Sequence, residues 1–302
     1  MTTQLHNVLS AENKHERDSH IVFEEEGHKY TITCDANSTY TSVTTWNHKQ
    51  FPIFDANLII KNMMRGKNWK EGHKYWGLTA KQIKEQWSNN GSAVSSAGTN
   101  MHYEIECFMN NPTLKAGYTH HELINNYYND NKENKENKNN QNNLIYSTLE
   151  WQYFLEFVKD NPTLKPYRTE WTIYHEELKL AGSIDMIYEN EDGTLSIYDW
   201  KRCKDITRIN TYNKFAVTKC ISHMPDSNFW HYTLQLNTYK SILEDKYGKV
   251  IKELFLVRLH PDAEEKTYEL IPLPILKREI DDLNNERLKL VNKTSYTDRK
   301  EN

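Results

Sequence analysis

The sequence predicts an α/β fold in which helices flank a mixed sheet. Three β-rich runs follow one another in the middle of the chain, at residues 169–174, 180–188 and 195–201. Helical spacing then covers residues 229–243, and a further strand pattern covers residues 250–259. Strands that alternate with helices along a chain are typical of α/β domains.

The second and third of these strands flank the turn signal Asp192-Gly193, which predicts a β-hairpin. Side chains alternate along a strand, so Asp199 and Lys201 share a face. A three-residue loop centred on Asp192 places Asp185 directly opposite Asp199. A two-residue loop at Asp192-Gly193 would instead turn Asp185 to the other face.

Two opposed carboxylates repel each other unless a cation lies between them. Lys201 supplies one positive charge on the face of Asp185 and Asp199, and a divalent metal held by carboxylate oxygens is the other candidate. The alternative interpretation is a surface hairpin whose charges are solvated. The rest of the chain has to distinguish the two.

The composition allows one large domain or two small ones, since the chain has 302 residues. The hydrophobic content of 37% and the mean hydropathy of −0.87 are low, and one polar tract accounts for much of the deficit. The net charge of −4 counts mildly against nucleic-acid binding, because such proteins are usually basic. The acids of a metal site and a solvated acidic tail both lower this total.

The four cysteines, Cys34, Cys107, Cys203 and Cys220, include no CxxC pair, so zinc-ribbon spacing is absent. Residues 1–20 are polar and do not have the pattern of a signal peptide, and no apolar run approaches transmembrane length. We therefore expect a soluble intracellular protein with reduced thiols and no membrane partner.

The N-terminal part predicts a hairpin and two helices after a frayed polar start at residues 1–19. The hairpin covers residues 21–33 and turns at Glu26-Gly27. The helices cover residues 55–65, capped by Asp55, and residues 78–87, capped by Thr79.

Two features of this part have an ordinary and a functional interpretation. Ser42 and Thr44 are suited to turns and helix caps, and their hydroxyls can also contact phosphates. Lysines and arginines lie among aromatic residues from Lys61 to Trp76. They form either a solvated helix face or a nucleic-acid surface.

A further helix, capped by Ser96 or Thr99, carries His102 and Glu106. The spacing of four residues places both on one face of the helix. A histidine and a carboxylate there suit a metal ion or the groups that orient its ligands. A single histidine on a helix is, however, usually structural.

Residues 112–147 look like an insertion, because residues 129–143 are a low-complexity Asn- and Lys-rich tract that cannot bury a core. We expect a disordered loop without a catalytic role. The remaining elements predicted are a helix at 146–158, a strand at 267–273, a helix at 275–291 and a disordered tail from Asn292.

Four motif blocks follow one order: Gly-Thr-x-x-His-x-x-x-Glu from Gly98, Gly-Ser-Ile-Asp from Gly182, Asp-Trp-Lys from Asp199 and Gln-Leu-x-x-Tyr from Gln235. This order resembles the PD-(D/E)XK nuclease superfamily, most closely its RecB-type branch. The Ser-Val-Thr run at Ser42, followed by a helical stretch, is similar to the mitochondrial genome maintenance exonuclease and to exonuclease-like proteins of large DNA viruses. One departure is Asp199, which stands where Glu is commoner.

The resemblance implies a restriction-endonuclease-like core of the order αβββαβ. It divides the chain into residues 1–94, a hairpin and helical extension expected to contact DNA, and residues 95–302, the nuclease core. The core would contain the Asn- and Lys-rich insertion at about residues 112–147.

The resemblance also implies a site for Mg²⁺ or Mn²⁺. The implied metal ligands are His102, Asp185, Asp199 and the backbone carbonyl of Trp200; the implied catalytic residues are Lys201, Asp185, Asp199 and Glu106. The implied supporting or DNA-binding residues are Glu170, Gln235, Tyr239, Ser42, Thr44 and Arg202. No iron–sulfur cluster is expected, because the downstream group of three cysteines found in some RecB-type nucleases is missing.

The expected function is that of a metal-dependent DNA nuclease, an exonuclease on single-stranded or end-resected DNA that acts in replication, repair or recombination. Proteins of those pathways are expected partners, and a viral origin would place the protein in the cytoplasm or nucleus of a host cell. The alternatives are a metal-dependent endonuclease on DNA or RNA, and a catalytically silent nucleic-acid-binding module.

Overall fold

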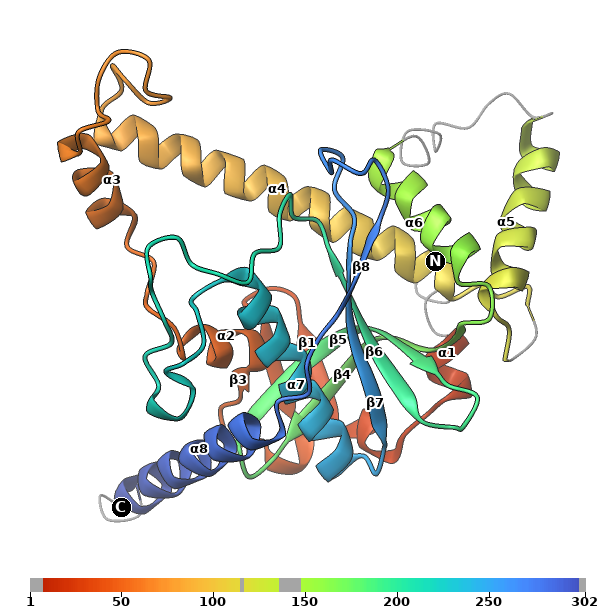
Figure 1. Cartoon of the computed structure of the whole chain (residues 1–302). Helices are drawn as coiled ribbons and strands as arrows, with labels where there is room; N and C mark the ends of the chain where they lie inside the picture. The colour runs from red at the N-terminus through yellow and green to blue at the C-terminus, as the bar shows by residue number, and fades with distance from the viewer. Residues whose placement is uncertain (1–7, 115–116, 136–147, 299–302) are drawn as a thin grey trace.

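The predicted hairpin lies at the centre of a six-stranded mixed sheet (Figure 1). The computed structural model describes residues 8–114, 117–135 and 148–298. The strands of the sheet are β3 (Thr41–Ser42), β4 (Lys165–His175), β5 (Leu180–Glu189), β6 (Leu195–Lys201), β7 (Ile251–Arg258) and β8 (Glu269–Pro272). The neighbours β4 and β5, β5 and β6, and β7 and β8 are antiparallel, whereas β3 with β5 and β6 with β7 are parallel.

The β5–β6 hairpin has the loop length that the sequence predicts. Asn190 donates its N–H to the carbonyl of Thr194, and Gly193 donates to the carbonyl of Asn190 and has a positive φ of 77°. This is a type I turn followed by a left-handed residue, a common three-residue hairpin loop. The paired residues Met186 and Tyr198 are the last of the ladder, and one more step places Asp185 opposite Asp199.

Helices cover both faces of the sheet (Figure 1). On one face, α2 (Val43–His48), α7 (Asn228–Lys246) and α8 (Lys277–Asp298) pack on strand residues that include Ile184 and Ile197. On the other face, α1 (Val8–Glu12), α4 (Ala80–Met109), α5 (His120–Lys135) and α6 (Leu149–Asp160) pack on strand residues that include Met186 and Tyr198. An α/β fold with a mixed sheet between helices is therefore confirmed.

The order of elements through α4, β4, β5, β6, α7 and β7 is the predicted αβββαβ succession, with α5 and α6 between α4 and β4. Helix α7 connects the parallel strands β6 and β7, as a parallel pair requires. The N-terminal hairpin is also present, as β1 (Ile21–Glu24) and β2 (Lys29–Ile32). Short 3₁₀ turns lie at Glu16–His20, Thr33–Asp35 and Lys219–Ile221.

The predicted helix at residues 55–65 is α3 (Ala56–Arg65), and the side chain of Asp55 accepts two backbone N–H groups at its start. Thr79 and Gln82 form the capping box that begins α4. Both N-caps match the sequence-based prediction. Helix α3 packs beside the first turns of α4, at a distance from the sheet (Figure 1).

The prediction that Ser96 or Thr99 begins a separate helix is wrong, because α4 runs without interruption for 30 residues. The hydroxyl of Thr99 bonds back to the carbonyl of Ser95, 3.2 Å away, which is what a hydroxyl does inside a helix. The boundary predicted between residues 94 and 95 therefore falls inside α4.

The predicted disordered insertion at 112–147 is corrected for the part that forms α5. Tyr118, Leu123 and Ile124 are buried against α6 and the sheet, so this segment contributes to the core. The polar tract that follows dominates the composition of this region, and the prediction of disorder, which was based on composition, therefore missed these apolar residues. Residues 115–116 and 136–147 lie outside the described residues.

The tail predicted to be disordered from Asn292 is helical as far as Asp298, because α8 continues past its buried residues Ile280 and Leu283. A helix that has already formed can continue without a buried face, because each added residue gains one backbone hydrogen bond. Across the three described ranges, no helix combines the length and the apolar character needed to cross a bilayer.

Candidate metal and catalytic site

Three carboxylates lie in a row across three adjacent strands. The two neighbours of Glu170 in the chain pair with the two neighbours of Asp185, so Glu170 and Asp185 lie opposite each other. The hairpin register places Asp185 opposite Asp199. Glu170 belongs to β4, Asp185 to β5 and Asp199 to β6. The row arises because side chains directly opposite each other in neighbouring strands share a face.

Glu170 has an unusual backbone, with a positive φ of 42° inside a strand. For a residue with a Cβ this conformation is uncommon and costs about 1–3 kcal/mol. Its carboxylate accepts a hydrogen bond from the Ser183 hydroxyl at 3.0 Å. Backbone strain of this kind concentrates at functional sites, and here it accompanies a carboxylate that faces Asp185.

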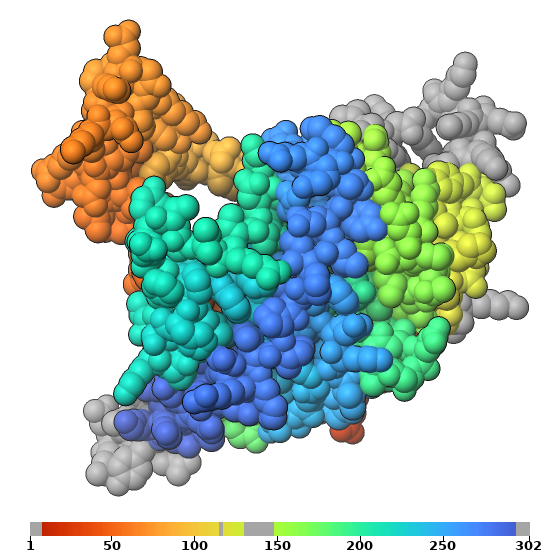
Figure 2. All heavy atoms as spheres, viewed as in Figure 1, coloured from red at the N-terminus to blue at the C-terminus, as the bar shows by residue number. Residues whose placement is uncertain are grey.

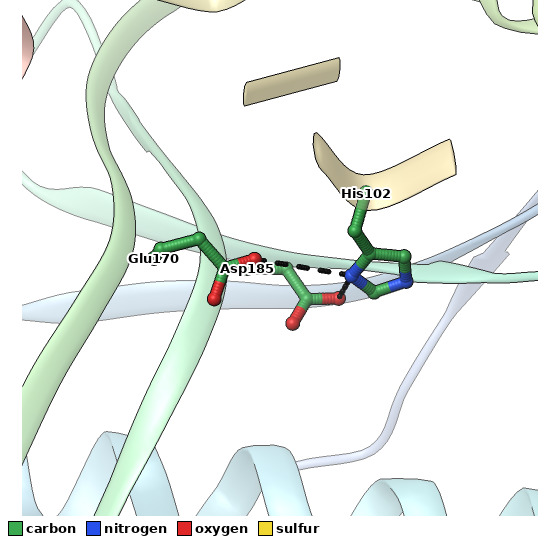
Figure 3. A group of neighbouring side chains, drawn as sticks. All are labelled: His102, Glu170 and Asp185. Atoms are coloured by element: carbon green, nitrogen blue, oxygen red, sulfur yellow. Dashed lines mark ion pairs between the residues drawn. The ribbon is translucent and has the colours of Figure 1, made fainter. Parts of the chain in front are cut away.

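His102 reaches this row from α4 (Figure 3). Its Nδ1 lies 3.4 Å from Oδ2 of Asp185 and 3.9 Å from Oε1 of Glu170. Its Nε2 lies 2.9 Å from the carbonyl oxygen of Trp200. Because a carbonyl oxygen only accepts, Nε2 carries the hydrogen, and Nδ1 is the nitrogen that faces the carboxylates.

The ligand atoms of His102, Glu170 and Asp185 all lie within 4.8 Å of one another. Carboxylate oxygens with one imidazole nitrogen suit Mg²⁺ or Mn²⁺. Metal-binding histidines usually donate their other N–H to a backbone carbonyl or a carboxylate, as His102 does to Trp200. The donor set therefore fits the expected kind of ion.

Asp199 is not in that group of three. The residue is 2% exposed, and Nζ of Lys201 lies 2.5 Å from its Oδ2. Of the predicted ligands, the structure brings His102 and Asp185 together with Glu170, whereas Asp199 pairs with Lys201, two residues along the same strand. The carbonyl of Trp200 accepts a hydrogen bond from His102.

The pKa values of the site reflect crowded acids in a buried place. Burial opposes protonation of His102, but Asp185 and then Glu170 raise its pKa to about 9. Burial, followed by the charge of Asp185, raises the pKa of Asp199 to about 6. Burial also raises the pKa of Asp185, and burial with the charge of Glu170 raises that of Glu106 to about 7.

These shifts mean that the ion-free site retains protons near neutral pH. A divalent cation bound there would supply the missing positive charge and displace these protons, since metal ligands must be deprotonated. Lys201 differs, because burial lowers its pKa but Asp199 and Asp185 raise it more, and the net direction is upward. Lys201 is therefore cationic at neutral pH, and its ammonium also lies 4.5 Å from the centre of the Tyr232 ring.

Tyr239 and Gln235 support the site from α7. Gln235 donates a hydrogen bond to the Tyr239 hydroxyl at 3.2 Å, and Tyr239 is 3% exposed. An ideal Cβ on Gly182 would lie 2.7 Å from Cε1 of Tyr239, so only glycine allows this approach. Tyr239 thus packs on the strand that carries Asp185 and does not face solvent.

Of the other three candidates, Ser42 and Arg202 make contacts within the protein and Thr44 is exposed. The Ser42 hydroxyl caps α2 by accepting the Thr45 N–H at 3.1 Å, while Thr44 is exposed on the same helix. The guanidinium of Arg202 lies 2.7 Å from Glu150 of α6. Ser42 is therefore a helix cap, and Arg202 is engaged within the protein.

Two residues that contact the site were not among the residues predicted from the sequence. Ser183 holds the carboxylate of Glu170, and Tyr232 lies against the ammonium of Lys201. Ser183 stands inside the Gly-Ser-Ile-Asp motif, so its position was visible. Tyr232 precedes Gln235 by three residues and Tyr239 by seven, a spacing that places all three on one face of a helix.

Neither a protein-family model nor a curated protein matches this chain. The function therefore has to be argued from the residues of the site and their arrangement. The arrangement consists of a histidine, a row of three acids and one half-buried lysine, all at the point where β5 and β6 separate.

Proposed function

We propose that this protein is a metal-dependent DNA nuclease of the PD-(D/E)XK type, and that it acts as an exonuclease on single-stranded or end-resected DNA. The observation that carries the proposal is the convergence of His102, Glu170 and Asp185 within 4.8 Å. The adjacent pair of the buried Asp199 and the half-buried Lys201 supports it further. The αβββαβ order and the four motif blocks support the family and the DNA substrate.

Mg²⁺ or Mn²⁺ would be held by Nδ1 of His102 and the carboxylates of Glu170 and Asp185. Such an ion supplies Lewis acidity, which lowers the pKa of a nearby water and neutralises charge on a phosphate. The hydrogen bond from Nε2 to the Trp200 carbonyl keeps Nδ1 directed at the two acids. Asp185 is fixed in turn, because its Oδ2 accepts the backbone N–H of Trp200 at 3.0 Å.

Lys201 provides a permanent positive charge beside the scissile phosphate. Asp199 and the ring of Tyr232 fix its ammonium, so little reorganisation is needed as charge develops on the phosphate oxygens. Glu106 lies one helical turn from His102, and its pKa of about 7 suits a group that accepts a proton near neutral pH.

The reaction joins a water oxygen to phosphorus and breaks the phosphorus bond to the leaving oxygen. Glu106 takes the proton of the water, and the leaving oxygen takes a proton from solvent. The ammonium of Lys201 stays protonated and stabilises the extra negative charge of the pentavalent phosphate.

The test uses end-labelled linear and circular DNA, single- and double-stranded, with Mg²⁺, Mn²⁺ or EDTA. Wild-type protein is compared with Asp185→Ala and Lys201→Ala, and with Glu191→Ala as a control. Glu191 is an exposed acid in the loop of the same hairpin. We expect metal-dependent loss of linear DNA with the wild type and the control only.

The labels then give the polarity of digestion. Cleavage of circular DNA would replace the exonuclease by an endonuclease. Absence of any cleavage by folded protein would refute the nuclease, and absence of Mn²⁺ binding in a calorimetric titration would refute the metal site. Mn²⁺ binding that Asp185→Ala abolishes would support the metal site independently of activity.

A further inference from the structure

A strongly basic stretch lies outside the site, on α3, the segment that follows it and the first turns of α4. Seven lysines and arginines and one acid, Glu71, occur between residues 61 and 84, in a chain of net charge −4. All seven basic side chains are exposed. Among the described residues, none of them forms an ion pair.

Four of these side chains line one groove between the two helices. Lys61 and Arg65 come from α3 and Lys81 and Lys84 from α4, and the groove has a volume of about 550 Å³. Its other lining residues are Asn57, Ile60, Met64 and Ala80, so no acid contributes to it. The one polar contact of these four cations that the structure gives is from Lys84 to the amide oxygen of Asn57, at 3.2 Å.

Four like charges around one groove repel one another and attract anions. The groove also includes the first turn of α4, where the free N–H groups of a helix favour negative charge. An extended anion such as a phosphate backbone can contact both helices at once. A single monovalent anion would leave most of the charge uncompensated.

Residues 53–87, which we call the α3–α4 lobe, stand apart from the body (Figure 2). The chain enters the lobe from α2 and returns to the body along α4 (Figure 1). The lobe also exposes aromatic rings. Phe54 is 70% exposed and Trp76 is 48% exposed. Tyr75 and Trp87 have a structural role, since the indole N–H of Trp87 donates to the Tyr75 hydroxyl at 2.9 Å.

A basic groove with exposed aromatic rings nearby is the combination that binds single-stranded nucleic acid. We propose that the α3–α4 groove binds the phosphate backbone of single-stranded DNA at a distance from the site of cleavage. This inference rests on the proposed function for the position of the cut end. The groove is then an anchor, and the His102 cluster receives another part of the same strand.

Helix α4 sets the separation between the two sites, because it carries Lys84 at one end and His102 near the other. The two residues are 18 positions apart, which corresponds to about 27 Å along a helix. A stacked strand rises about 3.4 Å per nucleotide, so about eight nucleotides are needed to bridge the sites. Strands shorter than that cannot use the anchor and the site together.

The test is fluorescence anisotropy with end-labelled thymidine oligonucleotides, about 4 and about 20 nucleotides long, in EDTA at several salt concentrations. The groove variant is K61Q/R65Q/K81Q/K84Q. The matched control is K29Q/K266Q/R278Q/K289Q, which removes the same charges from exposed positions on β2, a loop and α8.

We expect the groove variant to bind the long oligonucleotide at least tenfold more weakly. The slope of the logarithm of the binding constant against the logarithm of the salt concentration should decrease in magnitude by up to about 3, because each single-strand phosphate contact contributes about 0.7. The control should lose less than threefold, and the groove variant should lose less affinity for the short oligonucleotide, which cannot span the groove and the site, than for the long one. Equal losses in both variants, or an unchanged salt dependence, would overturn the anchor.

The double variant K81Q/K84Q repeats the measurement should the fourfold variant unfold, as judged by circular dichroism. Duplex DNA and single-stranded RNA of the same length form the comparison arms. Equal dependence of duplex binding on the groove would overturn the preference for a single strand. Equal dependence of RNA binding would overturn the restriction to DNA.

Binding in EDTA requires no cleavage, so the two proposals fail separately. Loss of binding in the groove variant, together with a wild-type protein that never cuts, would keep the anchor and refute the nuclease. A wild type that cuts DNA, together with a groove variant that binds DNA as tightly as the wild type, would keep the nuclease and refute the anchor. If both hold, the groove variant should degrade long strands more slowly and leave short strands unaffected.

Discussion

The positive charges of the body and of the α3–α4 lobe are used in opposite ways. In the body, most buried or half-buried cations face an acid. These pairs are Arg17 with Glu176, Arg168 with Asp18, Lys179 with Asp35, Lys201 with Asp199, Arg202 with Glu150 and Arg258 with Glu269. In the lobe, seven exposed cations have no acidic partner among the described residues.

The difference separates charges that stabilise the fold from charges that remain available to a ligand. A buried cation must be paired, because its desolvation otherwise costs several kcal/mol. An exposed cation is solvated and can exchange water and counter-ions for phosphates. Lys201 is the exception in the body, since it is both paired and placed where a phosphate would react.

The largest effect on stability is expected for Arg168→Ala. Arg168 is buried and contacts Asp18 at 2.8 Å, the carbonyl of Asn13 at 2.9 Å and the face of Trp171. Its loss leaves Asp18 unpaired and should lower the free energy of unfolding by about 3–5 kcal/mol. Urea denaturation measures this. A loss below about 1 kcal/mol would show that pairing in the body is not structural.

Lys201→Met should reduce the rate of DNA cleavage at least about 100-fold, the usual loss when one preorganised charge is removed. The side chain keeps a similar length, so the fold should be retained. Rates with saturating Mn²⁺ and circular dichroism check the two parts. A variant that folds and cuts at the wild-type rate would contradict the role of this charge. Lys252→Met, which removes an exposed lysine paired with Asp192, is the control.

Divalent metal should stabilise the protein, because the carboxylates of the site repel one another without it. Mn²⁺ at about 100 times its dissociation constant should raise the free energy of unfolding by about 2.7 kcal/mol. Neither His102→Ala nor Asp185→Ala should show this gain in a thermal-shift titration. A gain that survives both changes would place the ion elsewhere, for example at the cluster of His175, Glu176 and Glu177.

In the ion-free protein, Glu106 should contribute stability at acid pH that is lost as the pH rises from about 4.5 to about 7. Burial, and then the charge of Glu170, raises the pKa of Glu106 from 4.5 to about 7. The folded state therefore binds an extra proton in this window, which stabilises it at the acid end and no longer does at the neutral end.

The change in pKa of Asp199 acts in the same direction between 3.8 and about 6. Glu106→Gln should remove its contribution, so the free energy of unfolding by urea should fall less, or rise more, between pH 4.5 and 7 than in the wild type, whereas Glu191→Gln should match the wild type. A pH dependence that Glu106→Gln does not alter would show that the acid is ionised throughout.

The smallest effect is expected in the lobe. Lys61→Gln and Lys81→Gln remove cations that have no ion-pair partner in the described part of the chain, so the free energy of unfolding should change by less than about 0.5 kcal/mol. The same changes should weaken single-strand binding. A large loss of stability would indicate that these lysines support the fold, and the contrast with the body would disappear.

Several parts of the fold followed from local sequence. The capping residues Asp55 and Thr79 begin α3 and α4 as predicted, since a cap needs only its own side chain and the next three residues. The three-residue loop at Asp192 is equally local. Where composition was used alone, at α5 and at the end of α8, the prediction of disorder was wrong for the described residues.

The sequence by itself determined which acids face each other, because the parity of a hairpin depends only on its loop, and Asp185 opposite Asp199 followed from it. Tertiary structure decided the rest of the site. Glu170 joins the site through a strained backbone. His102, which lies 98 positions before Trp200 in the chain, reaches the site from α4, and Arg202 pairs with Glu150. Such contacts link elements far apart in the chain, and no local pattern specifies them.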